Sequence, residues 1–172
     1  MIGNTLIDNS ENLKLADTIK EILRNPKINH IDIATGYWDI PGTAVLAYEL
    51  NAFLARDNTK LRLLIGKDPY LFAQYNKNPK YKDIKNWPEE FIRTDINEIE
   101  VKPEYKNAVS FLLKYLGKTD KIEIHIFKKN ENEEKQFLHS KCYIFYGKGI
   151  SYGIIGSSNF TEKGLKENSE LN

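Results

Sequence analysis

Two short apolar runs on either side of a glycine-flanked turn constrain the fold of this chain more than any other feature. The runs are residues 142–146 (CYIFY) and residues 150–155 (ISYGII), and Gly147-Lys148-Gly149 lies between them. Apolar runs of this length around a Gly-rich turn are typical of a β-hairpin. Because side chains alternate between the two faces of a strand, every second residue of each arm is expected to point to the same side.

Polar residues bracket this hairpin. His139 and Lys141 precede the first arm, and Ser157 and Asn159 follow the second. If the turn centres near Gly149, Asn159 lies opposite His139 and Ser157 lies opposite Lys141. A neutral imidazole can attack phosphorus, while ammonium, hydroxyl and carboxamide groups bind the non-bridging oxygens. The pattern therefore predicts a phosphodiester site in which His139 is the nucleophile.

The same residues resemble the signature of the phospholipase D superfamily, H-x-K followed by G-S-x-N. Residues 159–165 (NFTEKGL) resemble the N-F-T-x-x-G-L continuation of its nuclease members, and Glu170 stands where the family has a carboxylate. The resemblance implies catalytic roles for His139, Lys141, Asn159 and Glu170, and phosphate binding by Lys141, Ser157 and Asn159. It also implies a covalent phosphohistidine intermediate and a reaction that requires no metal or other cofactor.

One position departs from the usual family pattern, H-x-K-x4-D, because Tyr146 replaces the aspartate. The interval to G-S-x-N is also longer than the commonest form. Metal-independent restriction endonucleases of the superfamily look similar in both respects. We therefore interpret Tyr146 as a subfamily trait at the end of a strand, on the face opposite His139.

The first half of the chain predicts a β-α-β unit. Residues 30–38 and 60–66 form apolar strand patterns, and a helical pattern spans about 43–56 between them. This order predicts a parallel strand pair with a right-handed crossover. After a short strand at 5–7, an earlier helix is expected that is capped by Asn9 or Ser10 and runs through Arg24. A later helix at about 104–116 and a strand at 122–127 complete the pattern.

Together these elements predict an α/β fold, a mixed β-sheet with helices on both faces, in a single domain over residues 1–172. The residues 31–38 (IDIATGYW) resemble the opening of phospholipase D-like domains at the N-termini of bacterial helicases. The resemblance implies that helicase or translocase domains belong to the same full-length chain. We therefore expect this chain to be an N-terminal part of a longer multidomain protein.

Net charge, cysteine content and hydropathy exclude some classes of protein but do not identify the function. The net charge of +1 gives no argument for a nucleic-acid partner, and the single cysteine, Cys142, fits a reducing cytoplasm. No apolar run reaches membrane-spanning length, and the N-terminus lacks the layout of a signal peptide. A cytoplasmic protein with no membrane partner is therefore expected, which disfavours a secreted lipase.

A single motif copy predicts a homodimer. In the superfamily a second motif supplies the histidine that protonates the leaving oxygen, so His139 of two subunits would have to meet at a two-fold interface. The leading hypothesis is a metal-independent endonuclease acting on DNA, within a helicase or restriction-type protein. One alternative is a non-catalytic nucleic-acid-binding module of a helicase, and a less favoured one is a lipid phosphodiesterase.

Several other residues have a functional and a structural interpretation. Residues 75–87 and the lysines of 128–135 suit a nucleic-acid strand but also suit solvated loops. Tyr37 and Trp38 either border the site or pack in the core. Cys142 is expected to be a packed thiol directed away from His139, and His125 is expected to face away from its isoleucine neighbours, at the surface.

Overall fold

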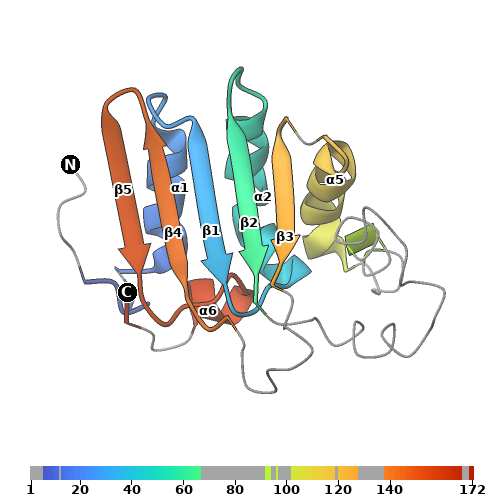
Figure 1. The fold of residues 1–172 in the computed structure, drawn as a ribbon. Coiled ribbons are helices and arrows are strands. Elements are labelled where there is room, and N and C mark those ends of the chain that lie inside the picture. The colour runs from blue at the N-terminus through green and yellow to red at the C-terminus, as the bar shows by residue number, and fades with distance from the viewer. Residues whose placement is uncertain are drawn as a thin grey trace, which may run out of the picture.

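A five-stranded sheet, in the order β3-β2-β1-β4-β5, forms the centre of the described structure (Figure 1). The computed structural model describes residues 6–11, 13–66, 92–93, 96, 102–118, 120–127, 138–167 and 171–172. The strands are β1 (His30–Thr35), β2 (Lys60–Ile65), β3 (Ile122–Ile126), β4 (Cys142–Gly147) and β5 (Ile150–Ile155). The helices are α1 (Leu15–Arg24), α2 (Ile40–Leu54), the 3-10 turn η2 (Pro103–Tyr105), α5 (Lys106–Tyr115) and α6 (Glu162–Lys166).

The sheet is mixed. β1, β2 and β3 run parallel, whereas β4 is antiparallel to β1 and to β5. The predicted β-α-β unit, the later helix and strand, and the C-terminal hairpin are all present. The α/β class and the mixed sheet expected from the sequence are confirmed.

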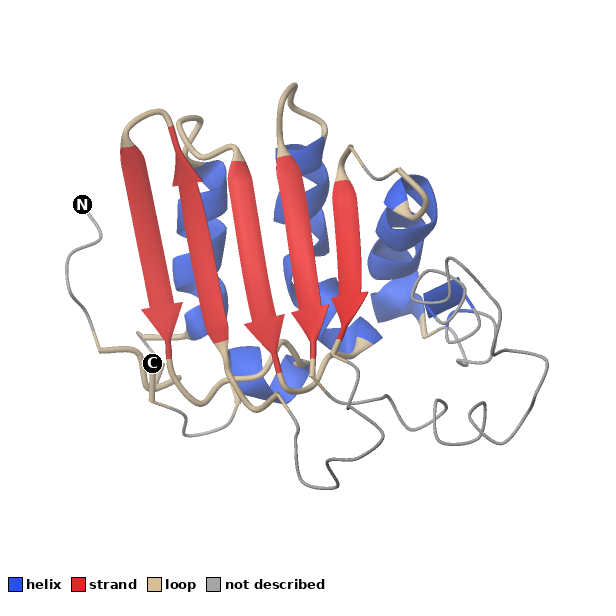
Figure 2. Cartoon of the chain, viewed as in Figure 1, coloured by secondary structure: helices blue, strands red, loops and turns tan. Residues whose placement is uncertain are grey.

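Helices α1, α2 and α5 lie on one face of the sheet (Figure 2). Alternate strand residues are buried under them, including Ile31, Ile33, Leu61 and Leu63, and Tyr143 and Phe145 of β4 are fully buried. The expectation of helices on both faces is therefore not met in the described part of the chain. Several residues that alternate with the buried ones are charged, including Asp32, Arg62 and Glu123, and this disfavours burial under a second layer.

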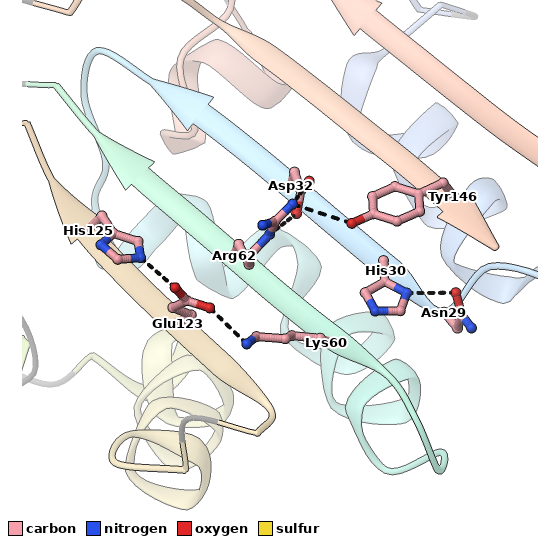
Figure 3. Close-up of polar contacts among 8 residues, drawn as sticks. All are labelled: Asn29, His30, Asp32, Lys60, Arg62, Glu123, His125 and Tyr146. Atoms are coloured by element: carbon pink, nitrogen blue, oxygen red, sulfur yellow. Dashed lines mark hydrogen bonds and ion pairs between the residues drawn. The ribbon is translucent and has the colours of Figure 1, made fainter.

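The opposite side of the sheet, called the open face below, carries charged and aromatic side chains (Figure 3). Arg62 forms a two-pronged ion pair with Asp32, with its Nε 2.7 Å from Asp32 Oδ1. Glu123 lies 2.7 Å from Lys60 Nζ and 2.6 Å from His125 Nε2. These pairs satisfy the polar groups that alternate with the buried residues.

The N-terminal helix begins later than expected. α1 starts at Leu15 with Lys14 at its N-cap position, not directly after Asn9 or Ser10, because Asn9 adopts a left-handed backbone (φ 60°) that interrupts a helix. Its side chain nevertheless works as a distant cap, since Asn9 Oδ1 accepts a hydrogen bond from Leu15 N at 2.9 Å. Ile7, expected in a short strand, instead exchanges backbone hydrogen bonds with Asn172.

Candidate active site

The hairpin forms as predicted, but its register differs by one residue. Cys142 pairs with Ile155 and Gly147 pairs with Ile150, so the turn consists of Lys148 and Gly149 alone. Both turn residues have positive φ, 22° and 76°, as tight two-residue hairpin turns require. The predicted pairing of Asn159 with His139 and of Ser157 with Lys141 is therefore wrong.

The polar residues lie beyond the strand ends. β4 starts at Cys142 and β5 stops at Ile155, and Gly156 N donates to Lys141 O at 3.2 Å. The strict alternation assumed for His139 and Lys141 does not apply to this irregular segment. The two residues differ in burial accordingly: His139 is exposed and Lys141 is buried.

The segment entering β4 crosses the carboxyl ends of β1 and β2. The backbone of Leu138 passes close to Gly66, the residue after β2, and to Gly36, the residue after β1. A Cβ added to Gly66 would lie 2.2 Å from Leu138 O, and a Cβ added to Gly36 would lie 3.3 Å from the same oxygen. Glycine at both positions allows the backbone of Leu138 to reach the sheet edge. His139, the next residue, is thereby placed at the carboxyl end of the parallel strands, where α/β folds commonly bind ligands.

Lys141 supplies a buried cation at this edge. Lys141 is only 4% exposed, and its Nζ donates a hydrogen bond to the backbone oxygen of His139 at 2.7 Å. Burying an ammonium group costs free energy, so a buried lysine at the end of the sheet is a candidate for a functional cation. The bond also ties the Lys141 head group to the residue predicted to be the nucleophile.

Asn159 is held in a defined orientation. The backbone N–H of Tyr37 donates to Asn159 Oδ1 at 3.0 Å. A backbone N–H can only donate, so the carboxamide oxygen must face it regardless of how the amide is assigned. The Nδ2 group is then the part of the side chain that can donate to a phosphoryl oxygen.

Lys141 and Asn159 meet at Gly36. A Cβ added to Gly36 would lie 3.2 Å from Asn159 Oδ1 and 3.6 Å from Lys141 Nζ. Two residues eighteen positions apart thus reach one bend at the carboxyl end of β1. The structure brings together the cation and the carboxamide that the sequence motif predicted, with the exposed His139 adjacent to Lys141 in the chain.

Ser157 has a different environment from the one expected. Its hydroxyl accepts a hydrogen bond from Leu171 N at 3.1 Å, and its own N–H donates to Leu171 O at 3.0 Å. Its neighbour Ser158 is fully buried and bonded to Asn172. The motif serines therefore fasten residues 171–172 beside the hairpin. Glu170 lies outside the described residues, as do residues 75–87 and the lysines of 128–135.

A half-buried aspartate, Asp39, joins the two helices nearest the site. Asp39 caps α2 by accepting from Gly42 N at 2.5 Å, and the same oxygen accepts from Glu162 N, in the first turn of α6, at 3.3 Å. Burial raises the pKa of Asp39, while the hydrogen bonds from Gly42 and Glu162 act in the opposite direction. Asp39 thereby holds the segment after β1 against the segment after Asn159.

Sequence analysis missed the contribution of Thr35 and Gly36, and it left open whether Tyr37 borders the site or packs in the core. Thr35 is completely buried at the end of β1 and contacts Tyr37, Asn159 and Phe160 through its hydroxyl. Tyr37 provides the amide for Asn159, and its residue is 43% exposed at the site. The Thr-Gly pair at the end of an apolar strand was the available signal, but only the three-dimensional contacts connect it to Asn159.

Residues given a structural interpretation from the sequence mostly lie on the open face. Tyr146 stacks on His30 with ring centroids 5.0 Å apart, and its hydroxyl accepts from Arg62 at 3.3 Å (Figure 3). His125 is exposed on the same face, as expected, and Cys142 lies there too, beside Ala34. Burial raises the pKa of the Cys142 thiol. Trp38 is buried, with Nε1 bonded to Thr43 Oγ1 at 2.9 Å.

Comparison with known families places this geometry in context. The family model described as "Cardiolipin synthase, PLD-like domain" matches residues 19–172. A search of curated proteins gave no significant match. Within the described residues, no helix is both long and apolar enough to cross a bilayer. The matched range contains both halves of the motif, residues 139–141 and 156–159.

Proposed function

Since the chain belongs to the phospholipase D-like (PLD-like) domain family, whose members act on phosphodiesters, we propose that it is a metal-independent phosphodiesterase that cleaves DNA through a covalent intermediate on His139. The observation that carries the proposal is the meeting of Lys141 Nζ and Asn159 at Gly36, beside the exposed His139. A buried cation and an oriented amide donor suit the two non-bridging oxygens of a phosphodiester.

In the proposed reaction a nitrogen of neutral His139 attacks phosphorus, and one P–O bond to the DNA breaks. The departing oxygen takes a proton, and the remaining DNA strand stays attached to His139 through a P–N bond. Water then attacks phosphorus, releases the histidine and leaves a phosphomonoester. Lys141 and Asn159 Nδ2 stabilise the charge on the equatorial oxygens in both steps.

Two further residues belong to the proposal. Ser157 Oγ accepts the Leu171 amide and still carries a hydroxyl proton that can be donated to phosphate. Glu170, bonded to the second ring nitrogen of His139, would fix its tautomer and stabilise the charged ring. These roles are proposed from the family motif.

The reaction also needs an acid for the leaving oxygen, and we propose the His139 of a second subunit. The proposal therefore includes a homodimer, in the cytoplasm, within a helicase or restriction-type protein. Sedimentation would test the oligomer: a monomer with full activity would contradict the two-histidine scheme.

Among phosphodiesters, DNA is favoured by Tyr37, an exposed aromatic residue whose backbone N–H bonds Asn159, because an aromatic side chain can stack on a base. A lipid phosphodiester is the second candidate, since the family description includes cardiolipin synthase. A module that binds nucleic acid without cleaving it is the third.

One experiment separates the three. Labelled single- and double-stranded DNA, and vesicles of a phosphatidyl lipid, are incubated with the protein in excess chelator. We expect wild-type protein to cleave DNA and His139→Ala to be inactive. The matched control is His125→Ala, which removes an exposed histidine from the open face. Cleavage of lipid alone would favour the second candidate, and DNA binding without cleavage the third.

A further inference from the structure

A fully buried hydroxyl lies between the two chain segments that hold Asn159. Thr35, the last residue of β1, donates from Oγ1 to Tyr37 O at 2.6 Å and accepts from Phe160 N at 2.9 Å. Thr35 thus bonds the carbonyl of Tyr37, whose N–H holds the Asn159 side chain, and it also bonds the backbone N–H that follows Asn159. We infer that Thr35 is a positioning residue, which orients Asn159 for the proposed phosphodiester reaction through these two neighbours.

The hydrogen-bonding capacity of a hydroxyl group determines which neighbours Thr35 can hold. Thr35 has one proton and two lone pairs, so donation to Tyr37 O and acceptance from Phe160 N engage it from both sides. Asn159 Oδ1 lies 3.4 Å from Thr35 Oγ1, a longer contact than either of the other two. Thr35 therefore acts on Asn159 mainly through the Tyr37 and Phe160 peptides.

The bond to Tyr37 O closes the bend around Gly36. This closure turns the Tyr37 N–H toward Asn159 Oδ1, where the two atoms are 3.0 Å apart. The bond from Phe160 N fixes the backbone immediately after Asn159, and the isolated bridge between Trp38 and Phe160 holds the same two segments together. Without the hydroxyl, both peptides would lose a buried partner and the Asn159 amide would lose its fixed direction.

The inference rests on the proposed function for its catalytic consequence, but the positioning can be measured without activity. Thr35→Val removes the hydroxyl while keeping the shape, and Thr35→Ser restores it. Thr59→Val is the matched control. Thr59 is also a buried threonine, with Oγ1 bonded to Arg56 O at 2.8 Å, but it precedes β2 at the opposite end of the strand from Gly66.

The first readout is hydrogen exchange of the Tyr37 and Phe160 amides, followed by NMR, together with the side-chain amide signals of Asn159. Thr35→Val should speed exchange of both amides at least about tenfold and shift the Asn159 signals. Thr35→Ser should exchange as wild type does, and Thr59→Val should leave these signals unchanged. Unchanged exchange in Thr35→Val, or equal effects of Thr35→Val and Thr59→Val, would overturn the inference.

The second readout is phosphodiester hydrolysis in excess chelator. Thr35→Val should lower kcat roughly 10- to 100-fold with a smaller change in KM, because a displaced transition-state donor acts mainly on the chemical step. Thr35→Ser should recover most of the rate. If Thr35→Val disorders Asn159 but the wild-type protein hydrolyses no phosphodiester, the proposed function is wrong and the positioning role of Thr35 stands. Full activity of Thr35→Val would remove the catalytic consequence.

Discussion

The joint cap formed by Asp39 makes a quantitative prediction about how the site is held together. Replacing Asp39 with Ala removes the hydrogen bond from Gly42 N at 2.5 Å and the longer one from Glu162 N at 3.3 Å. Loss of an N-cap costs about 1 kcal/mol, and the second bond adds roughly 0.5 to 1 kcal/mol. We expect Asp39→Ala to lower the free energy of unfolding by about 1.5 to 2 kcal/mol at neutral pH.

Urea unfolding followed by circular dichroism measures this loss. The control is Asp17→Ala, which removes an exposed acid from the first turn of α1 and should cost about 0.5 kcal/mol or less. If both variants lose the same free energy, the double cap does not stabilise the protein and the reasoning fails.

The pH dependence provides a sign test of the same residue. Burial raises the pKa of Asp39, so the folded protein binds a proton there more tightly than the unfolded chain does. The stabilisation from that proton is complete below the unfolded pKa and is lost as the pH rises through the folded pKa. The free energy of unfolding of wild type relative to Asp39→Asn should therefore fall with rising pH across this window. A rise would show that the hydrogen bonds outweigh burial.

Three further predictions concern the site edge and the open face. Gly36→Ala should lower activity at least about tenfold, because the new methyl group would lie 3.2 Å from Asn159 Oδ1 and displace it. A normal rate in steady-state kinetics would show that this contact is unimportant. Glu123, whose pKa is held at about 2 chiefly by the hydrogen bond from Lys60, stabilises the fold above pH 4.5. As the pH falls toward 2, the free energy of unfolding of the wild type should fall by about 0.5 kcal/mol more than that of Glu123→Gln. Equal losses in the two proteins would show that water screens the pair completely. Tyr146→Asp, which restores the usual family residue, should cost about 1 kcal/mol in urea unfolding without raising activity; a gain in activity would place Tyr146 in the reaction.

Much of the fold followed from local patterns in the sequence. The apolar runs at 30–38, 60–66 and 122–127 became β1, β2 and β3. The helix expected at about 43–56 became α2, which begins three residues earlier, at Ile40, because Asp39 caps it and Pro41 fits its first turn. The start of α1 was wrong because Asn9 bonds to Leu15 from outside the helix. This contact depends on a left-handed backbone that the residue type permits but does not require.

The sequence predicted which residues form the site better than it predicted how they are arranged. The motif identified Lys141 and Asn159, which the fold brings to Gly36. Their expected positions on one strand face were wrong because both residues lie beyond the ends of β4 and β5, where the alternation of a strand no longer applies. The role of Thr35 depends on contacts more than 120 positions away in the chain, which no local pattern encodes.

The most direct test of the account is whether His139 becomes covalently attached to its substrate. End-labelled DNA is mixed with the full chain in excess chelator, the reaction is stopped with denaturant within one turnover, and label on the protein is located by peptide mass spectrometry. The account predicts a DNA-phosphate adduct on His139 in wild type and in His125→Ala, and no adduct in His139→Ala. Rapid DNA cleavage with no adduct on His139, or an equal yield of adduct from His139→Ala, would contradict it.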